Sequence, residues 1–298
     1  MERQASLPFC TLLIVLSLVP TAAAQEYDLV YRFPKGKELR YKRVEKTTAL
    51  GQTQTGLSAD MDKTVETFFT LKPERAGDGN IVAVFLQDTA YVDDRSVSST
   101  TMGTGAVNFD NVLTKKPVRL TFTAKGELRS AEPLLPLSLP GSVVPVQERA
   151  LARQAMFLPV LPKHPVKIGG TWTDAASDTT YPKTNDPRLG PGEGMRISSV
   201  RTVYSVDSLV SLAGHTCLVI NWKGSIRIES KMIYKGSENF AEEETNLTGT
   251  MYFAVREGIL HRLVLSSKRE STTAIFATAS EIIPLSFTSD ITIELLPI

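Results

Sequence analysis

Apolar and polar residues alternate along most of the chain, as in strands that rest one face on a core. The clearest stretch is Val118–Ala124, and the longest is Leu218–Glu229. In the longer stretch one face carries Leu218, Ile220, Trp222, Gly224, Ile226 and Ile228. At about 3.3 Å per residue it would be roughly 40 Å long. Such length, with a glycine that permits a bend, predicts an all-β, mainly antiparallel fold built as a curved open sheet or half-barrel.

Further strands follow the same rule and are separated by turn signals. The alternation recurs at Val65–Leu71, Met251–Val255, Ile259–Leu265 and Phe287–Leu296. Asp78-Gly79, Lys125-Gly126 and Glu257-Gly258 are dipeptides typical of tight turns between antiparallel strands. These positions predict hairpins.

One segment has a helical rather than a strand pattern. Residues 146–157 are mostly good helix formers between two prolines, and Leu151, Ala155 and Leu158 form a narrow apolar stripe. We therefore expect one short helix in a connector at 143–160. The connector would separate an N-terminal β half, 25–142, from a C-terminal β half, 161–298. The Gly- and Pro-rich stretch 186–194 is expected to be an exposed loop.

The two halves contain similar hairpins. Residues 117–129 and 249–262 each consist of a strand, a basic residue, a glycine and a returning strand. Two explanations stay open. The chain could contain two similar β halves that arose by duplication, or both segments could simply follow the pattern common to β-hairpins.

Residues 1–24 have the features of a signal peptide. A short polar start precedes an apolar run, Leu7–Val19, and Ala22-Ala23-Ala24 provides a cleavage site before Gln25. We therefore expect an exported protein, periplasmic or extracellular and bacterial. Cleavage would leave Cys217 as the one cysteine, so the mature chain would have no internal disulfide. No later segment is apolar enough to predict a transmembrane span.

Composition and motifs narrow the function. The formal net charge of +1 gives no reason to expect a nucleic-acid partner. The 7% aromatic content and a C-terminus without an aromatic residue argue against an outer-membrane barrel.

His215 and Cys217 share a strand face, but two ligands do not make a metal site. Glu242-Glu243-Glu244 is expected in a solvated loop. With no nucleophile or phosphate-binding motif either, we expect no catalytic, cofactor-binding or metal-binding residues and no enzyme activity.

Three phrases of the sequence carry a family resemblance. They are Pro165–Trp172, Tyr204–Ile220 with Gly214 and Cys217, and Gly249–Leu260 with Phe253 and Gly258. They resemble secreted bacterial all-β proteins of uncharacterised families, near the lipoprotein-carrier (LolA-like) superfamily. The resemblance implies a strongly curved antiparallel sheet that clasps helices or an apolar ligand.

Two functions follow as hypotheses. The first is a cell-envelope carrier that binds a lipid or other apolar ligand, with Leu218, Ile220, Trp222, Ile226 and Ile228 lining one wall. The second is a structural or interaction module whose sheet edges pair with another envelope protein. Within either, Cys217 should be a buried, unreactive thiol, and Trp222 is expected to anchor a core unless it stacks on a ligand.

Overall fold

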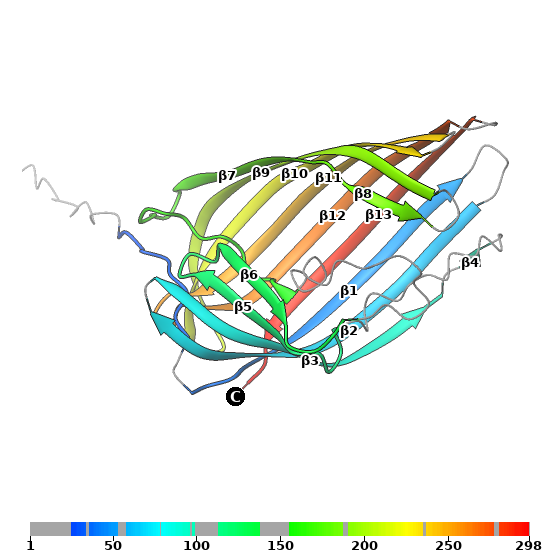
Figure 1. Cartoon of the computed structure of the whole chain (residues 1–298). Coiled ribbons are helices and arrows are strands. Elements are labelled where there is room, and N and C mark those ends of the chain that lie inside the picture. The colour runs from blue at the N-terminus through cyan, green and yellow to red at the C-terminus, as the bar shows by residue number, and fades with distance from the viewer. Residues whose placement is uncertain are drawn as a thin grey trace, which may run out of the picture.

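The computed structural model describes residues 25–33, 36–52, 58–77, 79–95, 97–98, 113–137, 155–186, 190–234, 237–276 and 280–297. Within these ranges the chain is built from thirteen strands and contains no α-helix (Figure 1). The strands are β1 Leu39–Gln52, β2 Ser58–Gly77, β3 Asn80–Asp94, β4 Val97–Ser98, β5 Val118–Thr123, β6 Leu128–Pro133, β7 Thr171–Thr180, β8 Lys183–Asp186, β9 Gly190–Leu212, β10 His215–Tyr234, β11 Ser237–Ala254, β12 Ile259–Phe276 and β13 Ser280–Leu295.

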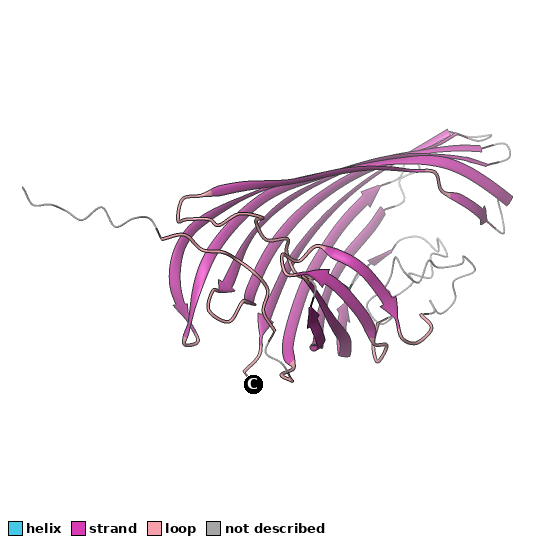
Figure 2. Cartoon of the chain, turned by 60° about the vertical axis from the view of Figure 1, so that its left-hand side comes forward, coloured by secondary structure: helices cyan, strands magenta, loops and turns pink. Residues whose placement is uncertain are grey.

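All thirteen strands belong to one antiparallel sheet. Its order is β6-β5-β3-β2-β1-β13-β12-β11-β10-β9-β7, with β4 beside β2 and β8 beside β9. Along this order, neighbours in space are neighbours or near-neighbours in sequence except at β1 and β13, which pair from Tyr41↔Leu295 to Gly51↔Leu285. Strands β1–β6 therefore lie on one side of this junction and β7–β13 on the other. The sheet curls but does not close on itself (Figure 2). This confirms the predicted all-β curved open sheet.

Among the described residues, the hydrophobic core lies at one end of the concave face. We call this the closed end; it is marked by fully buried side chains of the sheet, among them Leu39, Leu71, Leu120, Leu218, Phe253 and Leu260. Two extended segments, 25–33 and 155–166, cover them with further buried residues such as Leu29, Leu158 and Leu161. The opposite ends of the same long strands form the open end, which these segments do not reach (Figure 2).

The segment 25–33 runs between the two similar hairpins. The amide of Tyr31 donates to the carbonyl of Ala124 at 2.7 Å, and that of Arg32 donates to the carbonyl of Gly258 at 2.8 Å. Gly126 and Gly258 have φ of 87° and 67°, which confirms both predicted turns because this left-handed backbone favours glycine. The β5–β6 and β11–β12 turns thus hold the same N-terminal segment from two sides.

The predicted helix is not present in the part of the connector that the structure describes. Residues 138–154 lie outside the described ranges, whereas 155–158 form no α-helix. Ala155 and Leu158 of the predicted stripe are buried, and the ring of Phe157 lies 5.0 Å from that of Tyr41 and 4.8 Å from that of Phe69. In the described end of the connector, these side chains pack onto the sheet, whereas residues 146–154 of the predicted helix lie outside the described residues.

The stretch 186–194 is also different from the prediction. Asp186 ends β8 and Gly190–Gly194 begin β9, while 187–189 lie outside the described residues. A Cβ on Gly192 would meet the ring of Tyr234, and one on Gly194 would meet the backbone of Lys231. Here glycine permits close approach between neighbouring strands rather than a loop.

The glutamate cluster is part of a strand. Glu242, Glu243 and Glu244 lie within β11, with Glu242 and Glu244 exposed on the outer face and Glu243 on the opposite face. The prediction of a solvated loop is therefore wrong, although two of the three carboxylates do face solvent.

Candidate functional site

Strand register arranges the concave face into rows that cross the sheet. The row that ends the filled core consists of Trp172, Tyr204, Trp222, Gly249, Leu265 and Ile291, one each from β7, β9, β10, β11, β12 and β13. We call it the boundary row. On its closed-end side, Ile220 and Met251 are fully buried. The boundary row is thus the last row that belongs to the core.

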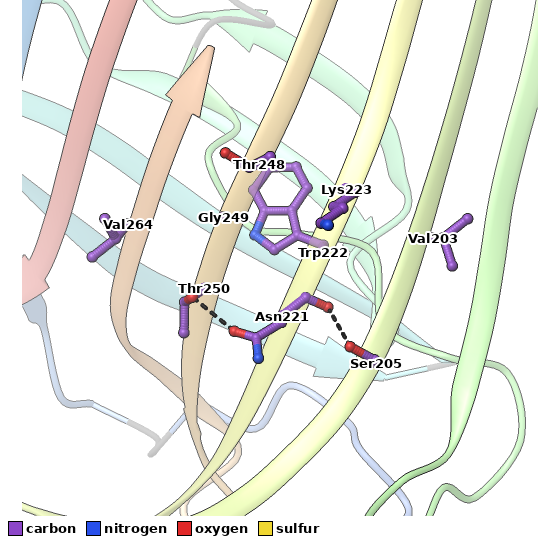
Figure 3. Close-up of a pocket in the computed structure, with 9 residues that line it drawn as sticks. All are labelled: Val203, Ser205, Asn221, Trp222, Lys223, Thr248, Gly249, Thr250 and Val264. Atoms are coloured by element: carbon purple, nitrogen blue, oxygen red, sulfur yellow. Dashed lines mark hydrogen bonds between the residues drawn. The ribbon is translucent and has the colours of Figure 1, made fainter.

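Three aromatic rings stack along the boundary row. Trp172 and Tyr204 have ring centroids 4.7 Å apart at 5°, and Tyr204 and Trp222 are 6.0 Å apart at 13°. Burial raises the pKa of Tyr204 to about 12, with a smaller contribution from Asp174. The indole of Trp222 lies against Gly249, where a Cβ would overlap it (Figure 3). The three stacked rings and Gly249 therefore form a close-packed layer at the end of the core.

The packing of the two tryptophans leaves polar atoms unsatisfied. The Nε1 atoms of Trp172 and Trp222 are buried and have no hydrogen-bond partner among the described residues. An unmade hydrogen bond of this kind costs about 1–3 kcal/mol. Both indoles pack against the core as partly buried side chains, which agrees with the expectation that Trp222 anchors a core.

The predicted apolar wall is divided by the boundary row. Leu218 and Ile220 are completely buried in the core, Trp222 lies in the boundary row, and Ile226 and Ile228 are half-buried beyond it. All five alternate along one face of β10, as the sequence pattern predicted. Among the described residues, the segments 25–33 and 155–166 cover the first part of the wall and do not reach the second part.

Beyond the boundary row, other strands add apolar side chains to Ile226 and Ile228. Thr245 pairs with Ile226 and Arg269, and Arg269 pairs with Phe287 of β13. Residues of the same face are Val200, Ile226, Ile228, Leu247, Leu285 and Phe287, and we call the surface that they line the open trough. These side chains are half-buried or exposed.

Paired charges border the open trough toward β12 and β1. The guanidinium of Arg269 lies 4.0 Å from the ring centroid of Phe287 and 4.0 Å from a carboxylate oxygen of Glu243. On β1, Arg43 pairs with Glu45, whose Oε1 accepts a hydrogen bond from Ser289 at 3.0 Å. The Nε atoms of Arg43 and Arg269 have no hydrogen-bond partner among the described residues. The trough therefore has an apolar side and a side with guanidinium groups.

Two cavities flank this region. One of about 240 Å³ lies on the concave face between the core and β1–β3, lined by Arg43, Glu45, Phe69 and Phe157 among others. The second, of about 610 Å³, is lined mainly by the other face of β9–β12 (Figure 3). There Thr250 Oγ1 donates to Asn221 Oδ1 at 2.8 Å. The sequence pattern singled out neither, because each depends on the register of paired strands, and the first also on the distant segment that contains Phe157.

The histidines and the cysteine lie near the closed end. His215 Nδ1 is 3.1 Å from Glu257 Oε1, and the rings of His215 and His261 are 5.4 Å apart. Cys217 is buried as predicted, and burial raises the pKa of its thiol to about 11. Among the described residues no group of three or more His, Cys, Asp or Glu side chains could hold a metal ion. The described part of the chain also contains no helix with the length and apolar character of a membrane span.

Comparisons with known proteins do not assign the chain to a family. No family model matches the chain, and no curated protein does. Solved structures that match include Neisserial surface protein A (7% identity, 86% of this chain and 97% of that one, TM-score 0.23). Acinetobacter baumannii OccAB4 matches at 6% identity over 88% and 99%, TM-score 0.30. The hypothetical lipoprotein YmcC from Escherichia coli matches at 12% identity over 82% and 85%, TM-score 0.22. Similarity this low supports no inference about this chain.

Proposed function

We propose that this chain is a non-catalytic, exported protein of the cell envelope that binds a lipid or another amphipathic apolar ligand in the open trough. One observation carries the proposal. The apolar row of β10 continues past the boundary row to Ile226 and Ile228, which the described segments that cover the core, 25–33 and 155–166, do not reach. Export rests on the signal-peptide pattern of residues 1–24.

The chemistry of the trough suits an amphipathic molecule. Full burial of an aliphatic or aromatic side chain stabilises a complex by about 1.5–3 kcal/mol, and Ile226, Ile228 and Phe287 offer such surface. From Trp222 to the end of β10 at Tyr234 the strand runs roughly 40 Å at about 3.3 Å per residue, enough for an acyl chain. Arg269, in the same row as Phe287, would face an anionic headgroup, because a guanidinium binds carboxylate or phosphate oxygens.

A second candidate is the interaction module, and the sheet edge favours it. Along Thr171–Thr180, β7 pairs with β9 and with no other described strand. All its residues except Trp172 are exposed. The free edge of such a strand can add a strand from another protein through main-chain hydrogen bonds.

A ligand-binding experiment separates these two functions. Mature protein from the envelope is analysed for co-purifying lipid, delipidated, and titrated with a long-chain fatty acid while tryptophan emission is recorded. Trp222 borders the trough, so binding should shift the emission. We expect Ile226→Asp to weaken binding about tenfold or more, equivalent to 1.4 kcal/mol, because the new carboxylate would be desolvated.

The control substitution is Ile233→Asp on the same strand. Ile233 lies on the outer face, so its replacement should leave the emission shift unchanged. If no lipid co-purifies and the fatty acid does not change the tryptophan emission, the carrier function is excluded and the interaction-module function remains.

A further inference from the structure

At the open end the outer face of the sheet becomes apolar. Large exposed side chains gather there from β9 to β13 and from the connection between β7 and β8. They are Tyr181, Met195, Ile197, Ile233, Phe240, Phe276 and Ile282, with exposed fractions from 37% to 72%. We call them the outer tip patch.

Register places the outer tip patch in neighbouring rows of the sheet, with Lys231 and Glu238 between its apolar residues. Met195 pairs with Lys231, Lys231 with Phe240, Phe240 with Ala274, and Ala274 with Ile282. In the next row toward the tip, Ile233 and Phe276 both pair with Glu238. The rings of Phe240 and Phe276 are 5.7 Å apart, and Tyr181 lines one shallow cavity with Met195 and Ile233.

A band of charge limits the outer tip patch toward the closed end. On the same face, Glu229 pairs with Glu242, and Arg227 pairs with Glu244, which in turn pairs with Glu270. From Glu229 to the end of β10 at Tyr234 the strand rises roughly 16 Å at about 3.3 Å per residue. The apolar surface is thus confined to the last residues of the strands.

The other face of the same tip is apolar as well. Met232, Tyr234, Ile275 and Ile283 alternate with the outer residues and are only half-buried. A protein that docked on one face of this single layer, a second copy included, would leave the other face in water. A lipid layer surrounds both faces at once, so the two-sided pattern favours a bilayer as the occupant.

Backbone and charge agree with shallow insertion. Strands β10–β12 have a described neighbour on both sides up to the tip, which satisfies their backbone groups in a lipid layer. The β1-facing edge of β13 has no described partner at 280–284, so only shallow insertion suits its backbone. Lys231 pairs with Glu238 at 3.2 Å and lies 4.9 Å from the ring centroid of Phe240, so its stem can cover apolar surface. Lys183 and Glu193 add one charge of each sign. The charges of these four described residues balance, so the patch that they border gives no reason to expect attraction to anionic lipids as the driving force.

We propose that the open end of the sheet is a membrane-docking tip, which partitions by its apolar side chains into the interface of a lipid bilayer. Insertion of about 5–10 Å, the usual depth of interfacial segments, would stop before the charged band. The proposal goes beyond ligand binding, because the outer tip patch requires no ligand in the trough.

Flotation with vesicles of zwitterionic phosphatidylcholine tests the docking tip. Delipidated mature protein should float with the vesicles, and the double variant Ile233→Asp/Phe276→Asp should reduce the bound fraction at least tenfold. Raising the salt from about 0.1 to 1 M shortens the Debye length from about 10 to 3 Å and should leave binding intact. Ile226→Asp, which changes the trough, should bind vesicles as the parent protein does while losing the emission shift with fatty acid.

A probe of depth covers the case in which the double variant does not fold. Ile233→Cys and Glu242→Cys, each carrying an environment-sensitive dye, should respond differently to vesicles, with a blue shift only at position 233. The docking tip is excluded if the parent protein stays with the aqueous fraction or if binding requires anionic lipid and disappears at high salt. A dimer that the double variant abolishes, without vesicle binding, would identify a second copy as the occupant instead.

Discussion

At the scale of single residues, the most informative titratable groups lie beside the closed end. Burial lowers the pKa of His261, and the neighbouring His215 lowers it further. Burial alone would raise the pKa of Glu257, but its hydrogen bond with His215 and contributions from the backbone and from nearby cations lower it overall. The three side chains therefore form a cluster in which His261 is held neutral beside an ionised carboxylate.

The depressed pKa of His261 predicts a loss of stability on mild acidification. The unfolded chain binds this proton at about pH 6.5, before the folded protein does, so the free energy of unfolding falls as the pH drops below that value. His261→Gln should flatten the decline between about pH 7 and 5, measured by urea unfolding. The contribution of Glu257 is lost only below its ordinary pKa of 4.5, outside this window.

The exposed His164→Gln serves as a control for this measurement. Its unfolding free energy should follow the parent protein across the same window. An unchanged slope in the His261 variant would show that His261 is not the group responsible.

At the scale of elements, two turn glycines offer a matched comparison. Gly79 and Gly126 both have positive φ, 74° and 87°. A Cβ on Gly79 would meet nothing within 4 Å, whereas one on Gly126 would lie 2.6 Å from the carbonyl oxygen of Pro159 and 2.9 Å from Cε2 of Tyr31. A comparison of substitutions at these two glycines therefore measures the contact between the β5–β6 turn and the segments 25–33 and 155–166 that cover the core.

Replacement of these glycines by alanine should separate conformation from packing. Gly79→Ala is expected to destabilise the protein by about 1–2 kcal/mol, the penalty of a left-handed backbone for an L-residue. Gly126→Ala should cost a further 1–3 kcal/mol or so, because the added methyl group overpacks a contact with backbone. Thermal unfolding of both variants measures the difference. Equal melting temperatures would mean that the β5–β6 turn is not tightly packed against Pro159 and Tyr31.

Local pattern predicted elements well where one residue and its near neighbours decide the structure. Alternation identified β5 and the inward face of β10, and tight turns were expected at Gly126 and Gly258. The beginning of β9 was missed because Gly192 and Gly194 look like breakers until Tyr234 and Met232 of the neighbouring strand lie over them. That contact depends on register, which a single sequence does not reveal.

The candidate site shows the same limit. The parity of Leu218, Ile220, Trp222, Ile226 and Ile228 followed from the sequence. Where the core stops along that row depends on segments far away in the chain, and so does the stack of Trp172 on Tyr204. The open trough and the outer tip patch are therefore properties of assembled strands.

At the scale of the whole molecule, the N-terminal segment closes the core. Tyr27, Leu29 and Tyr31 are buried and alternate with less buried residues, as in a strand. Tyr31 donates its hydroxyl to the carbonyl of Pro159 at 2.9 Å, and its ring meets that of Phe253 edge-on at 5.5 Å. Lys125 binds Asp28 and the carbonyl of Leu29, both at 2.7 Å. The segment thus joins the two sides of the open sheet at the closed end.

Truncation of this segment should open the closed end. A chain that begins at Pro34 loses three buried side chains worth about 1.5–3 kcal/mol each, so we expect a much lower melting temperature and binding of a hydrophobic dye. A chain that begins at Tyr27 keeps all three buried side chains and should melt at the same temperature as the mature protein. N-terminal sequencing of the exported protein is expected to give Gln25 as the first residue of that mature protein. Equal stability of the two truncated chains would show that β1–β13 pairing alone holds the sheet together. A large difference would show that the open sheet depends on residues 27–33 for its stability, so that the closed end folds completely only with the segment that follows the expected cleavage site.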